Sequence, residues 1–281
     1  MTVLIKAASE IKSTLSKEER PLGFVPTMGA LHDGHISLIK AAREECKTVV
    51  VSIFVNPLQF APNEDFKKYP RSLENDLKIC KENKVDYVFA PDEKEIYPDE
   101  GSKKELIEPP KELTEILCGK TRIGHFQGVT TVVKRFFDII QPDYAYFGEK
   151  DLQQLYIMKW LVKEYNFQIF IRSCPTVREP SGLAFSSRNQ YLTSEQKKAA
   201  ANIYESLKSA KYNIRIGIFT VSKAILESLV YLSQFPEMKV EYFEARDKDT
   251  LAKTDEAKRK GFFYFIAAKV GNVRLIDNLE V

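Results

Sequence analysis

Short apolar runs alternate with amphipathic segments along the first two thirds of the chain. The apolar runs are of strand length and apolar on both faces, as in buried parallel strands: LGFVPT, TVVVSIFV, DYVFA, DYAYFG and FQIFIRS. Between them, four segments carry apolar residues three and four positions apart, which is typical of helices: 34–46, 73–83, 128–140 and 152–165. This alternation predicts a doubly wound, Rossmann-like parallel sheet of the α/β class.

The pattern changes after Cys174. A polar, loop-like segment follows, and after it come two helical stretches, 194–212 and 220–233, and three strand-like segments, 238–246, 261–270 and 272–279. We therefore expect two domains, a Rossmann-like domain over 1–174 and a smaller C-terminal α+β domain over 175–281.

Composition and charge exclude several classes of protein. Forty-two basic and 39 acidic residues give a net charge of +3, and the charges are interspersed, so a nucleic-acid partner is not expected. The N-terminal sequence lacks the apolar core of a signal peptide, and the longest apolar runs are too short to cross a bilayer. Four dispersed cysteines without a CxxC pair indicate reduced thiols, and we expect a cytoplasmic protein without a membrane partner.

The first strand-to-helix junction, PTMGALHDGH, is the strongest candidate site. Gly29 and Gly34 permit close backbone approach, and the helix that begins near Gly34 offers unpaired N–H groups to an anion. His32 and His35 could both donate hydrogen bonds to that anion, which predicts phosphate binding. The alternatives are a helix cap with a packed ring, or a zinc site, although Asp33 is the one further ligand type nearby.

Two further junctions carry polar side chains suited to small ligands. Asn56 and Gln59 follow a strand and could bind a small polar substrate, although a plain Asn-Pro turn explains them equally well. Arg122 and His125 lie in a glycine-punctuated loop before a helix, where they could contact a phosphate or a carboxylate. A solvated arginine and a capping histidine are the alternative.

The last two candidate segments are FGEKDLQQL and GLAFSSRN. Lys150 could reach a phosphate and Asp151 a ribose or a metal, although charged residues also favour the first turn of a helix. In the second segment, Ser186, Ser187 and Arg188 could wrap phosphate oxygens and close over them, or they could form a turn before the next helix.

Taken together, these segments resemble the pantothenate synthetases, or pantoate–β-alanine ligases, of the nucleotidyltransferase superfamily with its HxGH motif. The resemblance rests on motifs in family order, PTMGALHDGH, FVNPLQF, GHFQGV, FGEKDLQQ and GLAFSSRN, and on the ending VGNVRLIDN. This sequence departs from the usual family motifs at three places: Ile123 in RIGHF, Phe185 before SSRN, and the run REPSG in place of a more acidic run.

The resemblance implies an ATP-dependent, AMP-forming ligase. Pantoate would attack the α-phosphorus of ATP to give pantoyl adenylate and pyrophosphate, and β-alanine would then release pantothenate and AMP. Mg²⁺ would accompany ATP, no organic cofactor would be tightly bound, and the protein would be a homodimer. The alternatives are another nucleotidyltransferase that acts on a different small carboxylate or phosphate, and a non-catalytic nucleotide- or RNA-binding module.

The resemblance also assigns residues. The catalytic groups would be His35, His32, Lys150 and Arg188. The ATP site would comprise Met28, Gly29, Ala30, Leu31, His32, Asp33, Gly34, His35, Gly148, Glu149, Lys150, Asp151, Val177, Phe185, Ser186, Ser187 and Arg188. Pantoate and β-alanine would meet Asn56, Gln59, Gln154, Arg122 and His125. Asp76 would lie near the Mg²⁺ ion.

Overall fold

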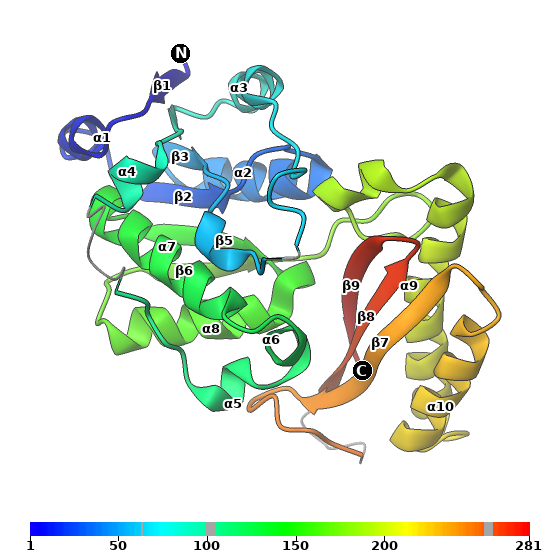
Figure 1. The fold of residues 1–281 in the computed structure, drawn as a ribbon. Coiled ribbons are helices and arrows are strands. Elements are labelled where there is room, and N and C mark those ends of the chain that lie inside the picture. Colours follow the sequence, from blue (N-terminus) through cyan, green and yellow to red (C-terminus); the bar gives the residue numbers. More distant parts are fainter. Residues whose placement is uncertain (63, 99–104, 256–260) are drawn as a thin grey trace. The chain divides into compact units, whose positions relative to one another are not determined.

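The structure is a computed structural model that describes residues 1–62, 64–98, 105–255 and 261–281 (Figure 1). The chain forms two compact units. Unit 1 comprises Met1–Glu149 and Gln153–Pro175, and unit 2 comprises Lys150–Leu152 and Thr176–Val281. The expected division into domains 1–174 and 175–281 stays a prediction.

Unit 1 contains a six-stranded sheet in which every pairing is parallel. Its strands follow the order β1 (Val3–Ile5), β4 (Tyr87–Phe89), β3 (Thr48–Ile53), β2 (Leu22–Thr27), β5 (Tyr144–Gly148) and β6 (Phe170–Cys174). The predicted doubly wound sheet is therefore confirmed. Strand β1 was not expected, because it has three residues and two of them are exposed, so it lacks the apolar run of a buried strand.

Helices cover both faces of this sheet. Apolar residues of α2 (Asp33–Glu45) and α3 (Leu73–Glu82) pack with Val25, Val51 and Val88 of the strands on one face. On the other face, Phe136 of α7 (His125–Ile140) packs edge-on against Phe24 and against Phe89. Because neighbouring residues of a strand point to opposite faces, Phe24 and Val25 serve different layers.

Further helices lie wholly or partly in unit 1. They are α1 (Ala8–Leu15), η1 (Pro57–Gln59), α4 (Glu93–Ile96), α5 (Lys111–Thr114), α6 (Leu117–Thr121), η2 (Glu149–Asp151) and α8 (Leu152–Glu164), the last two of which include residues of the segment assigned to unit 2. No helix among the described residues is both long and apolar enough to cross a membrane.

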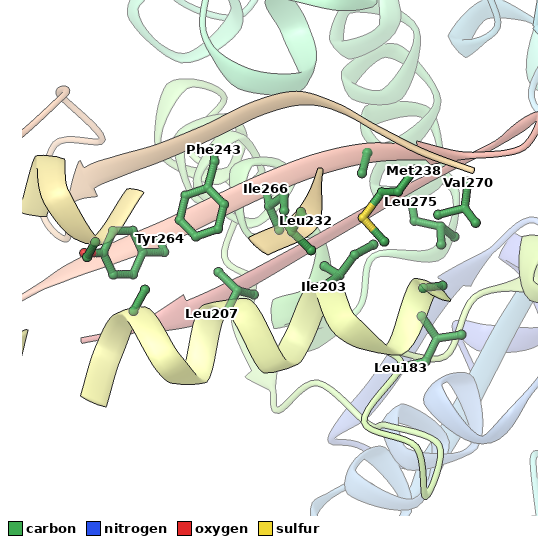
Figure 2. Packing of buried hydrophobic residues seen from close by; sticks show 14 of the residues in the cluster. Leu183, Ile203, Leu207, Leu232, Met238, Phe243, Tyr264, Ile266, Val270 and Leu275 are labelled. Atoms are coloured by element: carbon green, nitrogen blue, oxygen red, sulfur yellow. The ribbon is translucent and has the colours of Figure 1, made fainter. Parts of the chain in front are cut away.

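Unit 2 is a three-stranded antiparallel sheet packed against helices. Its strands follow the order β7 (Met238–Asp247), β8 (Phe262–Val270) and β9 (Val273–Glu280), and its helices are η3 (Ser187–Tyr191), α9 (Ser194–Arg215) and α10 (Val221–Leu232). Figure 2 shows Ile203 and Leu207 of α9 directed toward Ile266 of β8 in one continuous core. The predicted α+β character of this part of the chain is confirmed.

All four cysteines lie in the described part of the chain and are buried thiols. Burial raises the pKa of Cys80 to about 12 and that of Cys174 to about 11, so both are neutral near pH 7. These thiols are therefore packing residues rather than nucleophiles.

Candidate active site

The turn between β2 and α2 has a backbone that requires glycine. Gly29 and Ala30 both have positive φ, 79° and 51° respectively. A Cβ atom at Gly29 would lie 2.9 Å from Oδ2 of Asp76, so a side chain has no room there. The hydroxyl of Thr27 accepts a hydrogen bond from Gly29 N at 3.1 Å, which fixes the start of the turn.

Asp76 on α3 holds the other side of the same turn. Its carboxylate accepts hydrogen bonds from the backbone N–H groups of Ala30, at 3.0 Å, and Leu31, at 2.8 Å. The residue is 1% exposed, and this burial raises the pKa of Asp76 although the two N–H donors lower it.

This arrangement does not fit a cation held directly by Asp76, because both carboxylate oxygens face the backbone of the turn. Among the described residues, no group of three His, Cys, Asp or Glu side chains could hold a metal ion. That finding also argues against the zinc site considered for the histidine pair. The role of Asp76 near Mg²⁺ stays a prediction.

His32 and His35 form a reciprocal cap at the start of α2. Nδ1 of His32 accepts from Gly34 N at 3.1 Å, and Nδ1 of His35 accepts from His32 N at 3.4 Å. Since Nδ1 is the acceptor in each ring, the neutral imidazole carries its proton on Nε2. The rings lie 4.1 Å apart between centroids, so two Nε2–H donors stand together at a helix N-terminus.

Asn56 is a buried hub rather than an exposed ligand group. It is 1% exposed, and its Oδ1 accepts from the hydroxyl of Tyr97 at 2.9 Å and from Leu58 N at 3.2 Å. Its Nδ2 donates to the carbonyl of Gly128 at 3.0 Å and to Oε1 of Gln59 at 3.2 Å. All four hydrogen-bonding positions of this amide are therefore used within the protein.

The side chain of Asn56 fixes the amide of Gln59. Nε2 of Gln59 lies 3.0 Å from Sδ of Met28, while its Oε1 accepts from Asn56. Helix α7 packs closely against the backbone of Leu58, the residue before Gln59. A Cβ atom at Gly128 of this helix would lie only 2.3 Å from the carbonyl oxygen of Leu58. The polar tip of Gln59 is thus preorganised next to the turn that carries the histidines.

Arg122 and His125 are tied to the segment that follows Gln59. Arg122 makes a bidentate ion pair with Glu64, at 2.6 and 2.7 Å, and its Nη1 lies 2.9 Å from Nε2 of His125. Nδ1 of His125 lies 2.8 Å from the carbonyl oxygen of Gln59. Ile123 between them is 89% exposed, so this departure leaves the ion pair intact.

The two adjacent glutamines of α8 have different surroundings. Gln153 is 5% exposed and makes three hydrogen bonds to backbone, with Cys118 N, Leu113 O and Ile116 O. The side chain of Gln154 is partly exposed and makes no hydrogen bond within the part of the chain that the structure describes. Gln154 is therefore the amide available to a ligand.

Most of the other predicted nucleotide residues lie in unit 2, whereas Gly148 and Glu149 lie in unit 1. Nζ of Lys150 lies 3.5 Å from the carboxylate of Asp151, and Oγ of Ser186 accepts from Arg188 N at 3.3 Å as the cap of η3. The carbonyl of Val177 accepts from Phe185 N at 3.0 Å, which closes the loop between them. Of the other predicted positions, Gly148 ends β5, Glu149 begins η2 and Ser187 begins η3.

Two residues of unit 1 that hold the site carried no recognisable signal in the sequence. Glu64 contacts Arg122 and Tyr97 contacts Asn56, each from a position distant in the chain. Their importance depends on tertiary contacts that no local pattern encodes.

Comparison with known proteins places this geometry in a family. A family model described as Pantoate-beta-alanine ligase matches residues 3–280. The pantothenate synthetase of Coprothermobacter proteolyticus is 46% identical over 279 residues, 99% of this chain and 97% of that protein. The chain also spans about half the length of a bifunctional pantoate ligase/cytidylate kinase of Thermosynechococcus vestitus, with 47% identity over 257 residues, 92% of this chain.

Solved structures agree with this result. The pantothenate synthetase of Thermus thermophilus superposes with a TM-score of 0.94 at 40% identity and covers 99% of both chains. A pantoate-beta-alanine ligase from Francisella tularensis, complexed with beta-gamma ATP and beta-alanine, gives a TM-score of 0.83 at 39% identity, covering 99% of this chain and 97% of that one.

Proposed function

Since the chain belongs to the pantoate-beta-alanine ligase family, we propose that its residues carry out the ligation in two steps, through a pantoyl adenylate. The overall reaction is ATP-dependent ligation of pantoate with β-alanine. In the first step, the pantoate carboxylate attacks the α-phosphorus of ATP and pyrophosphate leaves. In the second, the β-alanine amine attacks the acyl carbonyl, and AMP leaves with the electrons of the broken acyl–phosphate bond.

The observation that carries the assignment of residues is the reciprocal histidine cap. His32 and His35 each accept a backbone hydrogen bond at Nδ1, so each neutral ring presents Nε2–H as a donor. Together with the N-terminus of α2, these donors suit phosphate oxygens on which negative charge grows as pyrophosphate departs. His35 would act there as a hydrogen-bond donor or acid rather than as a nucleophile.

We assign the acyl substrates to the two glutamines. Gln59 is held by Asn56 and Met28, which orients its amide before a ligand arrives, whereas Gln154 keeps both its donor and its acceptor for the ligand. Two uncharged amides can bind the hydroxyl and carboxylate groups of pantoate without neutralising the attacking carboxylate. Arg122 and His125 would then position the Gln59 segment, and direct contact with β-alanine stays a prediction.

Lys150, Ser186, Ser187 and Arg188 are proposed contacts for the phosphates of ATP, because an ammonium, a guanidinium and hydroxyls bind phosphate oxygens. Mg²⁺ would enter with ATP and neutralise β- and γ-phosphate charge while keeping several waters. A homodimer and a cytoplasmic location also stay predictions, and the molecular mass in solution tests the first.

Pyrophosphate release from Mg-ATP with pantoate alone tests the two-step proposal, followed by addition of β-alanine. We expect a burst of pyrophosphate close to one per active site, and then turnover that yields pantothenate and AMP. If no pyrophosphate appears until β-alanine is added, the separate adenylation step is wrong. If pantoate never supports pyrophosphate release, the alternative nucleotidyltransferase that acts on another small acid is favoured instead.

A further inference from the structure

The end of strand β9 interrupts the apolar pattern of its buried face. Val273 and Leu275 alternate on the face that joins the core of unit 2, and Figure 2 shows Leu275 within that core. The same alternation places Asp277 on this face, opposite Ile266 of β8, and Asp277 is only 4% exposed. A carboxylate in an apolar position costs free energy unless it is paired and hydrogen-bonded.

Asp277 is paired with Arg178, the residue that follows Val177. The two groups form a bidentate ion pair with N–O distances of 2.5 and 2.8 Å, and the guanidinium lies 3.6 Å from the ring centroid of Tyr204. Asp277 also accepts the backbone N–H of Asn278 at 2.8 Å. The ion pair therefore fixes the end of β9, and with it the orientation of Asn278.

Asn278 points to the opposite face of the strand, since consecutive strand residues alternate. It is 7% exposed, and its Nδ2 donates to the backbone carbonyl of Lys150 at 3.0 Å. This hydrogen bond joins residues 128 positions apart. It holds the main chain at Lys150, from which the lysine side chain extends.

We propose that Asn278, oriented by the Arg178–Asp277 ion pair, is a positioning residue that sets Lys150 for the phosphates of ATP. This inference rests on the proposed role of Lys150. In this role Asn278 acts through Lys150: it fixes the main chain of Lys150 and thereby limits where the ammonium group can lie. A purely structural role, in which the hydrogen bond only anchors β9, would affect stability but not one half-reaction selectively.

A double-mutant cycle of Asn278→Ala and Lys150→Ala separates these possibilities. The rate measured is pantoate-dependent pyrophosphate release, and the second half-reaction is measured with supplied pantoyl adenylate and β-alanine. We expect Asn278→Ala to slow the first about 10-fold, the scale of one well-placed hydrogen bond, and the second less than about 2-fold. The double variant should be no slower than Lys150→Ala alone.

The outcomes distinguish failure of this inference from failure of the proposed role of Lys150. If Lys150→Ala adenylates normally, both are overturned. If Lys150→Ala is slow but Asn278→Ala is normal, or if the two effects multiply, only the positioning role is overturned.

Arg274→Ala is the matched control, because it removes an ion pair to Glu241, at 2.8 Å, from the same strand. It should leave pyrophosphate release unchanged, and a loss equal to that of Asn278→Ala would overturn the positioning role. Asn278→Ser keeps a short donor and should retain more of the rate than Asn278→Ala. The same cycle is run with Asn278→Ser if the alanine variant does not fold.

Discussion

The carboxylate of Asp76 accepts a hydrogen bond from the backbone N–H of Leu31 at 2.8 Å, across 45 residues of sequence. Together with the bond from Ala30, this contact fastens α3 to the turn that precedes the histidine pair. The turn between β2 and α2 is therefore held in shape by a side chain that lies outside it.

Asp76→Ala should lower the free energy of unfolding by about 2–3 kcal/mol even without nucleotide, because one buried and one partly buried N–H group lose their acceptor. Urea unfolding measures this loss. Glu74→Ala, an exposed change in the same helix turn, is the control and should alter stability by less than about 0.5 kcal/mol. If Asp76→Ala keeps its stability but needs much more Mg²⁺ for half-maximal rate, Asp76 serves the metal instead.

His35→Ala should slow pantoate-dependent pyrophosphate release by about 100-fold or more, the scale of one preorganised donor. Its effect on stability should be small, because its capping bond to His32 N is long, at 3.4 Å. Thr193→Ala, which removes a cap of α9, is the converse control and should cost stability but not adenylation rate. An undiminished rate in His35→Ala would contradict the assignment.

The Glu64–Arg122 pair should stabilise the protein at neutral pH but not in acid. Burial raises the pKa of Glu64, but the hydrogen bonds and charge of Arg122 outweigh it, so the folded-state pKa lies below the ordinary 4.5. The contribution is therefore present above about pH 4.5 and is lost as the pH falls through the lower folded value.

We expect Glu64→Gln to be about 1–2 kcal/mol less stable than the wild type at pH 7, with the difference shrinking below pH 4.5. Urea unfolding of both proteins across this range measures it. A difference that stays constant with pH would mean that packing, and not the ionised carboxylate, accounts for the effect.

The adjacent residues Gln153 and Gln154 should respond oppositely to alanine substitution. Gln153→Ala removes the acceptor of Cys118 N and a donor to each of two partly buried carbonyls, so it should destabilise the protein by about 2–3 kcal/mol. Gln154→Ala should leave the melting temperature nearly unchanged and raise the KM for pantoate about 10-fold or more, the scale of one lost hydrogen bond to a charged ligand. Equal effects of the two substitutions on pantoate KM would contradict the assignment of Gln154.

The elements that the sequence predicted well are those with a local signature. The apolar run at 22–27 became β2, and the HDGH turn became the start of α2, because strand length, helix period and glycine placement are encoded by neighbouring residues. The resemblance located the candidate segments in the same way.

Distant partners could not be predicted from local patterns. Asn56 and Arg122 stood out as polar residues in loops, and ligand binding explained them as well as any structural role. Their partners Tyr97 and Glu64 are 41 and 58 residues away, so only the folded chain shows that both side chains are already engaged. In the same way, the resemblance assigns Gln154 to the acyl substrate, but only the folded chain shows that the adjacent Gln153 is buried and hydrogen-bonded to backbone.

The tight passage of α7 past the Leu58 carbonyl restricts how this gene can vary. Every missense change in a glycine codon adds at least a Cβ atom, and at position 128 that atom would collide with the backbone at 2.3 Å. Neither the Gly128 nor the Leu58 backbone can shift easily, because the Gly128 carbonyl accepts a hydrogen bond from Asn56 and Leu58 N donates one to Asn56. In a population of cells that must make their own pantothenate, this codon should therefore tolerate only synonymous change.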